Sequence, residues 1–214
     1  MSELLQVRNL VKRFESGGGW LGGPRQTVRA VNDVSFSVAR GQSLGLVGES
    51  GCGKSTVART LLRLIEPDEG SIVFDGHDIR QASASALRAL RQRIQIVFQD
   101  PYASLNPRRT VRQALSEPLR VHRRGTAAQI DAKVEQTIQE VGLPLSALDR
   151  YPHEFSGGQR QRIGIARALV LDPELIVADE PVSALDVSVQ AQILQLLERP
   201  VSYTHLTLPT ILLV

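Results

Sequence analysis

A glycine-rich stretch in the first third of the chain has the residue types and spacing of a phosphate-binding loop: Gly48, Glu49, Ser50, Gly51, Cys52, Gly53, Lys54 and Ser55. Glycines let the backbone curl so that successive amide N–H groups face one anion, and a following helix adds its partial positive charge. Lys54 is expected to reach the β- and γ-phosphates, Ser55 to ligate Mg²⁺ and Thr56 to support the α-phosphate. The alternative is a glycine-rich turn into an ordinary helix, with Cys52 simply a small residue tolerated there.

Two adjacent carboxylates, Asp179 and Glu180, follow the continuous apolar run Leu175–Ala178. Strand alternation points neighbouring side chains in different directions, so the two carboxylates are expected to have separate jobs. Asp179 is expected to hold Mg²⁺ through water, and Glu180 to orient or deprotonate an attacking water beside the γ-phosphate. The alternative is a solvated strand end without chemistry.

A second stretch suited to anions is Ser156, Gly157, Gly158 and Gln159, which precedes a helical pattern from about Arg160 to Val170. A serine hydroxyl, glycine amides and a helix start together form an anion site. The chain already has one phosphate loop, so a second site needs a second purpose.

Five motifs occur in a fixed order: the phosphate loop, Gln99 at a strand end, Phe155 to Gln159, Asp179 with Glu180, and Ser183-Ala184-Leu185-Asp186. Together they resemble the ATP-binding subunits of ABC transporters, over Leu4 to about Leu197. The resemblance implies a Mg²⁺-dependent ATPase that works as a head-to-tail pair, with ATP and Mg²⁺ as cofactors.

The resemblance also implies roles for individual residues. Ser156, Gly157 and Gly158 would close on the γ-phosphate of ATP held by the partner's phosphate loop, which explains two anion sites in one chain. Gln99 would sense Mg²⁺ and the γ-phosphate, and Asp186 would contact the opposing subunit. Phe14 would stack on adenine, or would equally be a core phenylalanine.

Sequences beside two of these motifs narrow the resemblance to a subgroup. Gln99 to Pro107 and Tyr151 to Phe155 look like the ATPases of bacterial oligopeptide and dipeptide importers. The implied partners are transmembrane permease subunits, a second ATP-binding subunit in a homodimer or heterodimer and, indirectly, a periplasmic solute-binding protein, but no nucleic acid. The implied location is the cytoplasmic face of the inner membrane. Two alternatives stay open: an importer ATPase for nickel or glutathione, and a soluble ATPase acting on ribosomes or DNA.

The elements that position these motifs alternate between strand and helix. Leu4 to Leu10 and Val28 to Val38 predict two strands joined by a glycine-rich loop, and Ser43 to Val47 predicts a strand before the phosphate loop. Further strands are predicted at Ser71 to Phe74, Ile94 to Phe98 and Leu175 to Ala178.

Between Pro101 and about Glu154 helical signals replace strand signals, and Thr126 with Gln129 has the spacing of a capping box. The fold class is therefore α/β: a P-loop NTPase (RecA-like) core with an N-terminal antiparallel β subdomain and a helical signature insertion. Residues 1–98 and 157–198 are assigned to the core, 99–156 to the helical subdomain and 199–214 to an aberrant tail.

Composition excludes several classes of protein. The 214 residues are 42 % hydrophobic and 22 % charged, which argues against disorder and collagen-like sequence. The net charge of +3 is by itself too small to point to nucleic acid or to anionic lipid. One cysteine excludes an internal disulfide, and no secretory leader or bilayer-length apolar run is found, so a cytosolic protein is expected.

The last fifteen residues differ from the rest of the chain. From Pro200 to Val214 there are two prolines, three threonines and no Asp, Glu, Lys or Arg. The family would place a buried strand and a switch histidine after Leu197; His205 comes too early for that role. Val201 to Thr210 resembles translated sequencing-adapter read-through, so the natural protein is expected to be longer. This version is expected to lack a sheet strand, which could impair hydrolysis.

Overall fold

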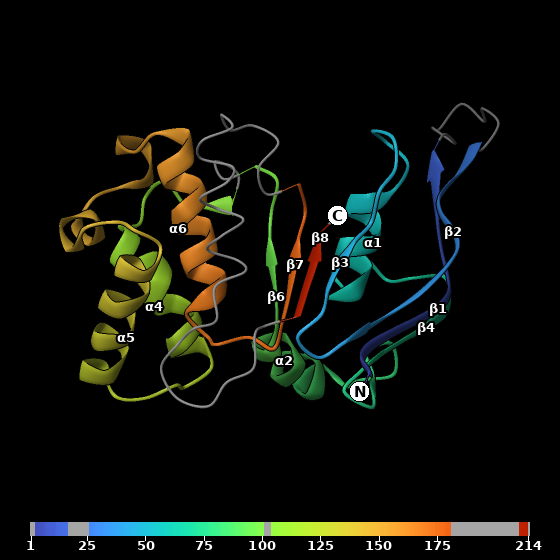
Figure 1. Ribbon diagram of the computed structural model, residues 1–214, viewed down its shortest axis with the longest axis horizontal. Helices are drawn as coiled ribbons and strands as arrows, with labels where there is room; N and C mark the ends of the chain where they lie inside the picture. The colour runs from blue at the N-terminus through green and yellow to red at the C-terminus, as the bar shows by residue number, and fades with distance from the viewer. Residues whose placement is uncertain (1–2, 17–25, 101–103, 181–209, 214) are drawn as a thin grey trace, which may run out of the picture.

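The computed structural model describes residues 3–16, 26–100, 104–180 and 210–213. Figure 1 shows the antiparallel sheet at one end of the molecule, the parallel sheet in the middle, and the helices between residues 111 and 169 at the other end. The arrangement confirms the α/β class with an antiparallel subdomain and a helical insertion.

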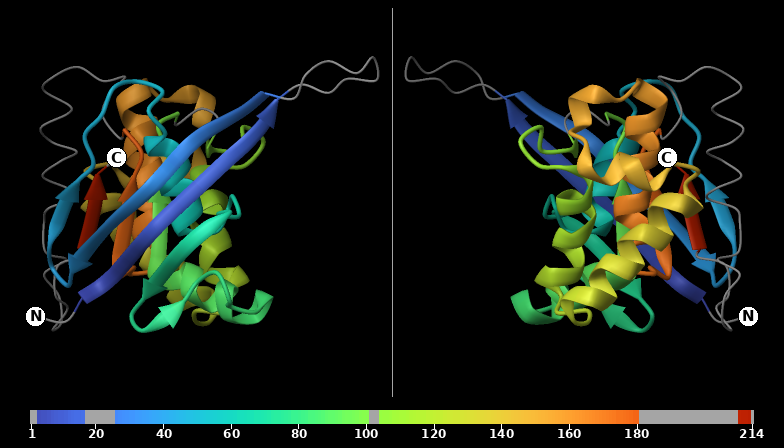
Figure 2. Two further views of the ribbon diagram at one scale, coloured as in Figure 1. Left: turned by 90° about the vertical axis from the view of Figure 1, so that its right-hand side faces the viewer. Right: turned by 90° about the vertical axis from the view of Figure 1, so that its left-hand side faces the viewer.

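The antiparallel sheet has the strand order β2-β1-β4-β5. Its strands are β1 (Glu3–Ser16), β2 (Gln26–Ala39), β4 (Glu69–Phe74) and β5 (His77–Asp78). The long β1 and β2 cross the molecule diagonally (Figure 2). Their apolar side chains bury against α1 and α2, forming a core with Ile72 and Phe74.

The parallel sheet has the strand order β3-β8-β7-β6. Its strands are β3 (Ser43–Gly45), β6 (Ile94–Val97), β7 (Leu175–Ala178) and β8 (Thr210–Leu213). All four side chains of β7 are buried, as the continuous apolar run predicts for an inner parallel strand. The carboxyl ends of β6 and β7 lie side by side because Val97 pairs with Ala178.

Strand β8 differs from the expectation that the segment after Leu197 supplies no sheet strand. Ile211 pairs in parallel with both Ser43 of β3 and Ile176 of β7, so the segment fills the position between them. Its apolar, β-branched sequence suits a buried parallel strand, whatever the origin of the residues. Whether 199–214 belongs to the natural protein stays a prediction.

The helices begin and end at residues that the sequence marks clearly. They are α1 (Lys54–Leu61), α2 (Ala84–Arg93), α4 (Val111–Val121), α5 (Ala127–Glu140), α6 (Gly157–Leu169) and the 3₁₀ turns η1 (Leu145–Asp149) and η2 (Pro152–Glu154). Thr110, Thr126 and Ser156 each close a capping box with a glutamine three residues later. The predicted box at Thr126 is confirmed.

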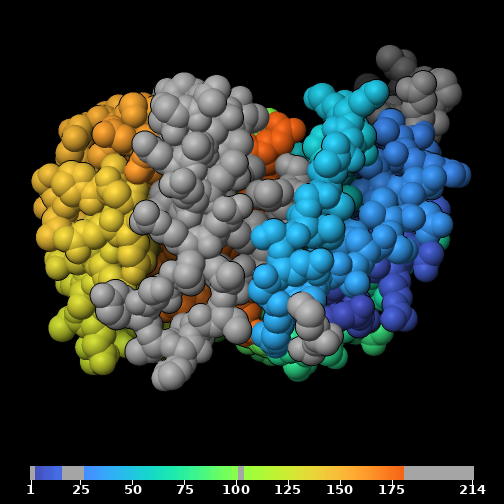
Figure 3. Space-filling view, viewed as in Figure 1, coloured from blue at the N-terminus to red at the C-terminus, as the bar shows by residue number. Residues whose placement is uncertain are grey.

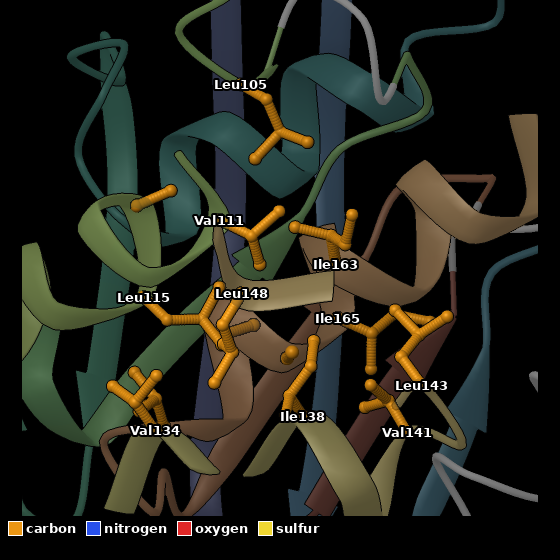
Figure 4. Packing of buried hydrophobic residues seen from close by; sticks show 14 of the residues in the cluster. Leu105, Val111, Leu115, Val134, Ile138, Val141, Leu143, Leu148, Ile163 and Ile165 are labelled. Carbon is orange, nitrogen blue, oxygen red and sulfur yellow. The ribbon is translucent and has the colours of Figure 1, made fainter. Parts of the chain in front are cut away.

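Helices α4, α5 and α6, with the 3₁₀ turn η1, form a helical lobe that has its own apolar core. Figure 4 shows Ile163 and Ile165 of α6 among side chains of α4 and α5, such as Leu115 and Ile138. Figure 3 shows this lobe and the antiparallel sheet at opposite ends of one face. Helix α6 therefore belongs to the helical packing as much as to the parallel sheet.

Several sequence predictions fall outside the described residues. These are Pro101 to Ala103, the motif Ser183 to Asp186, the helical stretch Val187 to Leu197, and His205. Their predicted roles are untested by the structure.

Candidate functional site

The phosphate loop joins β3 to α1, and its glycines are required by its shape. Gly51 has φ 82° and Gly53 has φ 101°, values that residues with a side chain rarely adopt. A Cβ on Gly53 would lie 1.8 Å from the carbonyl oxygen of Ala30 in β2, so only glycine fits against that strand. On the side shown in Figure 3, the segment from β3 into the loop lies on the molecular surface.

Lys54, the first residue of α1, folds back over the loop. Its Nζ donates to the carbonyl oxygens of Gly48 at 2.9 Å and Glu49 at 3.2 Å. The same nitrogen lies 3.9 Å from Oε1 of Glu180. The cation is thus centred between the loop and the strand end, where a bound phosphate would meet it.

Ser55 and Asp179 meet although 124 residues separate them. The Ser55 hydroxyl donates to Oδ1 of Asp179 at 2.8 Å, and Asp179 is only 1 % exposed. The backbone N–H of Asp179 donates to Val97 O, which holds this carboxylate in line with the β6–β7 pairing. A hydroxyl and a carboxylate oxygen in contact are hard ligands of the type that Mg²⁺ prefers.

Glu180 turns away from the buried strand. Its φ of 43° is left-handed, an uncommon conformation for a residue with a side chain. Gln99, at the end of β6, donates from Nε2 to Oε2 of Glu180 at 2.7 Å. The carboxylates of Asp179 and Glu180 therefore face different partners as expected, but the left-handed backbone at Glu180, beyond the end of β7, separates them rather than strand alternation.

The donor set fits a magnesium ion that takes most of its ligands from elsewhere. In the described parts of the chain, three or more His, Cys, Asp or Glu side chains nowhere gather in a metal-binding arrangement. Ser55, Asp179 and Gln99 offer oxygen ligands only, and too few to enclose an ion. A Mg²⁺ held here would need phosphate oxygens and water to complete its shell.

The second anion stretch lies on α6, away from the phosphate loop along the chain and in space (Figure 1). Ser156 caps the helix: its Oγ accepts from the Gln159 N–H at 3.3 Å, and Gln159 Oε1 accepts from the Ser156 N–H. Beneath it, the buried Arg160 donates from Nε to Phe155 O at 2.8 Å. The stretch is rigidly supported, while Ser156 itself is exposed.

Comparison with known proteins supplies the family. The model of the ABC transporter family matches residues 31–183, a span that includes the phosphate loop, Ser156–Gln159 and the Asp179–Glu180 pair. The chain belongs to the ABC transporter family.

Relatives in this family are similar over most of the chain. The oligopeptide transport ATP-binding protein AppF of Bacillus subtilis strain 168 is 55 % identical over 196 residues, covering 91 % of this chain and 60 % of AppF. The glutathione import ATP-binding protein GsiA of Pectobacterium atrosepticum is 53 % identical over 194 residues, 91 % of this chain and 31 % of GsiA. The chain thus spans about three fifths of AppF's length and less than a third of GsiA's.

A solved ABC structure shares the fold closely. The ATP-binding cassette MJ0796, in a dimeric post-hydrolysis state bound to ADP and Pi, superposes with a TM-score of 0.83 at 26 % identity. The match covers 98 % of this chain and 86 % of MJ0796. The P-loop NTPase class predicted from the sequence is confirmed.

Phe14, the family's predicted adenine-stacking residue, lies near the loop with its ring partly free. It pairs with Val28 of β2, two residues before Ala30, whose carbonyl abuts Gly53. The ring is 40 % exposed, and the Nζ of Lys12 lies 5.5 Å from its centroid. Stacking on adenine stays a prediction for this family member.

Sequence reasoning missed two arginines beside this ABC site. A depression of about 420 Å³ is lined by Arg59, Phe98, Gln99, Asp100, Ser104, Arg167 and Asp179. Arg167 donates to the backbone oxygen of Ser104, and burial lowers the pKa of its guanidinium. Arg59 lies four residues after Ser55 on α1, so helical spacing would have placed both on one side of the helix.

No helix in the described parts of this ABC chain is long and apolar enough to cross a membrane. In the importer-like stretch at Tyr151, the exposed rings of Tyr151 and His153 stack with their centroids 5.7 Å apart. Tyr102 of the other stretch lies outside the described residues.

Proposed function

We propose that the chain is the ATP-binding and hydrolysing subunit of an ABC importer. The observation that carries the proposal is the convergence of Lys54, Ser55, Gln99, Asp179 and Glu180 at one end of the parallel sheet. A cation, oxygen ligands and a carboxylate poised beside the phosphate loop are the parts that phosphoryl transfer to water requires.

Each residue has a distinct task in this proposal. Lys54 leaves the carbonyls of Gly48 and Glu49 to pair with the β- and γ-phosphates of ATP. Ser55 and Asp179 hold Mg²⁺, which when bound neutralises phosphate charge. Glu180, already oriented by its bond from Gln99, accepts a hydrogen bond from the attacking water and takes its proton.

Two chains are proposed to act as a head-to-tail pair. One protomer presents Ser156, Gly157 and Gly158 to ATP on the other, and Asp186 contacts the opposing subunit. The exposed start of α6, built on its capping box and Arg160, supports this arrangement. MJ0796, a cassette of the same fold, is described as dimeric.

The proposed substrates are peptides. A periplasmic binding protein would deliver them to a pair of permease subunits, which would import them. The similarity to AppF supports this class, and the similarity to GsiA supports glutathione as the second candidate. The site of action would be the cytoplasmic face of a bacterial inner membrane. Co-purification with permease subunits supports transport, whereas recovery with ribosomes or DNA would redirect the proposal to the soluble alternative.

Two variants separate binding from chemistry. Glu180→Gln is expected to slow ATP hydrolysis at least ~10²-fold while leaving ATP binding intact, since it removes a general base. Lys54→Ala is expected to abolish binding of ATP and ADP, measured by calorimetry. If hydrolysis by Glu180→Gln matches the parent protein, the assigned base is wrong; if Lys54→Ala binds ATP normally, the loop is not the phosphate site.

A further inference from the structure

The positive charge of this chain is concentrated in two segments. Residues 79–99 contain four arginines and residues 118–130 contain three, and neither segment contains Asp, Glu or Lys. These seven charges exceed the net +3 of the whole chain, so the remaining residues sum to −4. The distribution is uneven enough to create a local field.

The fold brings the two segments together, at the helix that precedes β6 and the end of α4. Nη2 of Arg88, on α2, donates to Val121 O at 2.8 Å. Nε of Arg124 donates to Oε1 of Gln92 at 3.0 Å, so each segment donates one hydrogen bond to the other. Because α2 leads into the start of β6, this surface lies at the opposite end of that strand from Gln99.

Four exposed arginines form what is called here the basic patch: Arg88, Arg120, Arg123 and Arg124. Within the described ranges, no carboxylate forms an ion pair with any of the four, whereas Arg112 nearby has three acidic partners, Asp131, Glu135 and Asp149. Helix α4 thus contains one arginine whose charge is neutralised inside the fold and another, Arg120, whose charge faces solvent.

His122, which lies among these arginines in the sequence, is affected by their positive charge. Burial, and then the positive charges of Arg88 and Arg124, lower the pKa of His122. Two guanidiniums are therefore close enough to one imidazole to oppose its protonation. The patch is a set of like charges held together without counter-charges from the described chain.

An apolar side chain and a hollow adjoin these charges. Val121, between Arg120 and His122 at the end of α4, is 46 % exposed. A depression of about 570 Å³ lies beside it, lined by Arg109, Gln113, Glu117, Arg120 and Val121. Guanidiniums around an exposed aliphatic residue suit contact with a membrane, whose surface is charged and whose interior is apolar.

We propose that the basic patch binds the headgroups of anionic phospholipids and rests this face of the protein on the membrane. Guanidiniums pair with phosphate in bidentate fashion, and a cluster of four or more basic residues suffices for lipid attraction. The choice of lipid over nucleic acid rests on the proposed importer function and on the patch having no Phe, Tyr or Trp on which bases could stack.

The test measures binding of the full chain to vesicles of phosphatidylcholine with phosphatidylglycerol, against vesicles of phosphatidylcholine alone. Binding only to the anionic vesicles, weakened by salt, is expected. The variant R120Q/R123Q should weaken binding about 25-fold, from about fivefold for each arginine lost. Within the described part of the chain neither side chain forms a hydrogen bond or an ion pair, so the change leaves packing intact.

Matched variants isolate the patch from net charge. R8Q/R29Q removes the same charge from the exposed face of β1 and β2 and should leave vesicle binding within about twofold, which is below the loss of a single arginine. R120K/R123K should retain most of it because the charge remains. Equal losses in R8Q/R29Q and R120Q/R123Q would overturn the proposal, since net charge alone would then explain binding.

Further arms separate this proposal from the nucleotide site and from other anions. Lys54→Ala should lose ATP but still bind vesicles, so the two proposals fail independently. Inorganic phosphate should compete no better than sodium chloride of equal ionic strength. Binding of single-stranded DNA that depends on Arg120 and Arg123, without binding to anionic vesicles, would overturn the lipid assignment.

Discussion

The two ends of the parallel sheet both gather charged side chains from distant parts of the sequence, but they pair them differently. At the carboxyl ends of the strands, Lys54 lies 3.9 Å from Glu180 and donates its hydrogen bonds to carbonyl oxygens of the phosphate loop. At the amino ends, Arg93 and Arg40 are both bonded to Asp75 and Glu174 in a closed network of two cations and two anions.

That network joins the two sheets. Asp75 follows β4 and Arg40 follows β2 of the antiparallel sheet, whereas Arg93 precedes β6 and Glu174 precedes β7. The guanidinium of Arg93 also lies 5.0 Å from the centre of the Phe74 ring. Each charge therefore has its partners inside the fold, and none is left for a ligand.

The difference shows how one sheet serves two purposes. A saturated network stabilises the native state and holds the sheets in register. A site for phosphate must instead keep its cation loosely engaged and its backbone in uncommon conformations, as at Gly53 and Glu180. The following substitutions test whether stability and binding separate between the two ends in this way.

The largest effect is expected at Gly53. Gly53→Ala places a Cβ 1.8 Å from Ala30 O at a φ of 101°, so it should cost about 4 kcal/mol of unfolding free energy and abolish ATP binding. Gly51→Ala has the same kind of φ but open space, and should cost about 1 kcal/mol. Chemical denaturation and calorimetry check both; equal costs would show that the contact with β2 is unimportant.

A substitution in the Arg40–Asp75–Arg93–Glu174 network should lower the unfolding free energy but leave ATP affinity unchanged. Arg93→Met leaves Asp75 and Glu174 facing each other with only Arg40, and is expected to lower the unfolding free energy by about 2 kcal/mol, since the site is partly exposed. ATP affinity should be unchanged. Arg13→Met, which breaks the surface pair with Glu69, serves as the control at about 0.5 kcal/mol.

Lowering the pH should weaken the ion-pair network that Asp75 and Glu174 form with the two arginines. Hydrogen bonds from Arg93 lower the pKa of Asp75 below its ordinary 3.8 and that of Glu174 below its ordinary 4.5. Because the native pKa values are depressed, the stability they provide is complete above about pH 4.5 and is lost as the pH falls through the native values. Unfolding curves at several pH values should show this decline, and Arg93→Met should flatten it.

The smallest effect is expected at Cys52. Its thiol is exposed, and the proposed site binds phosphate through backbone amides, so Cys52→Ser should change ATP affinity by less than about twofold, a difference well below that of one hydrogen bond. A tenfold loss in a calorimetric titration would assign the thiol a role that its position does not suggest.

Much of the fold follows from local patterns. The apolar run at Leu175–Ala178, the caps at Thr126 and Ser156 and the glycines of the loop each predict their own structure, because periodicity and capping act over a few residues. Strand β8 was missed because a short β-branched segment in an unusual tail forms a strand only when an open position between β3 and β7 receives it.

The sequence by itself determined which residues are candidates for the chemistry: a lysine and serine after a glycine loop, two acids after a buried strand, and a serine opening a helix. Only the tertiary structure decided that Ser55 meets Asp179, that Gln99 orients Glu180 and that the arginines of α2 and α4 gather on one surface. The reason is physical. Motifs are set by the conformational preferences of neighbouring residues, whereas these contacts join residues 33 to 124 positions apart and form only when burial of the two cores brings their elements together.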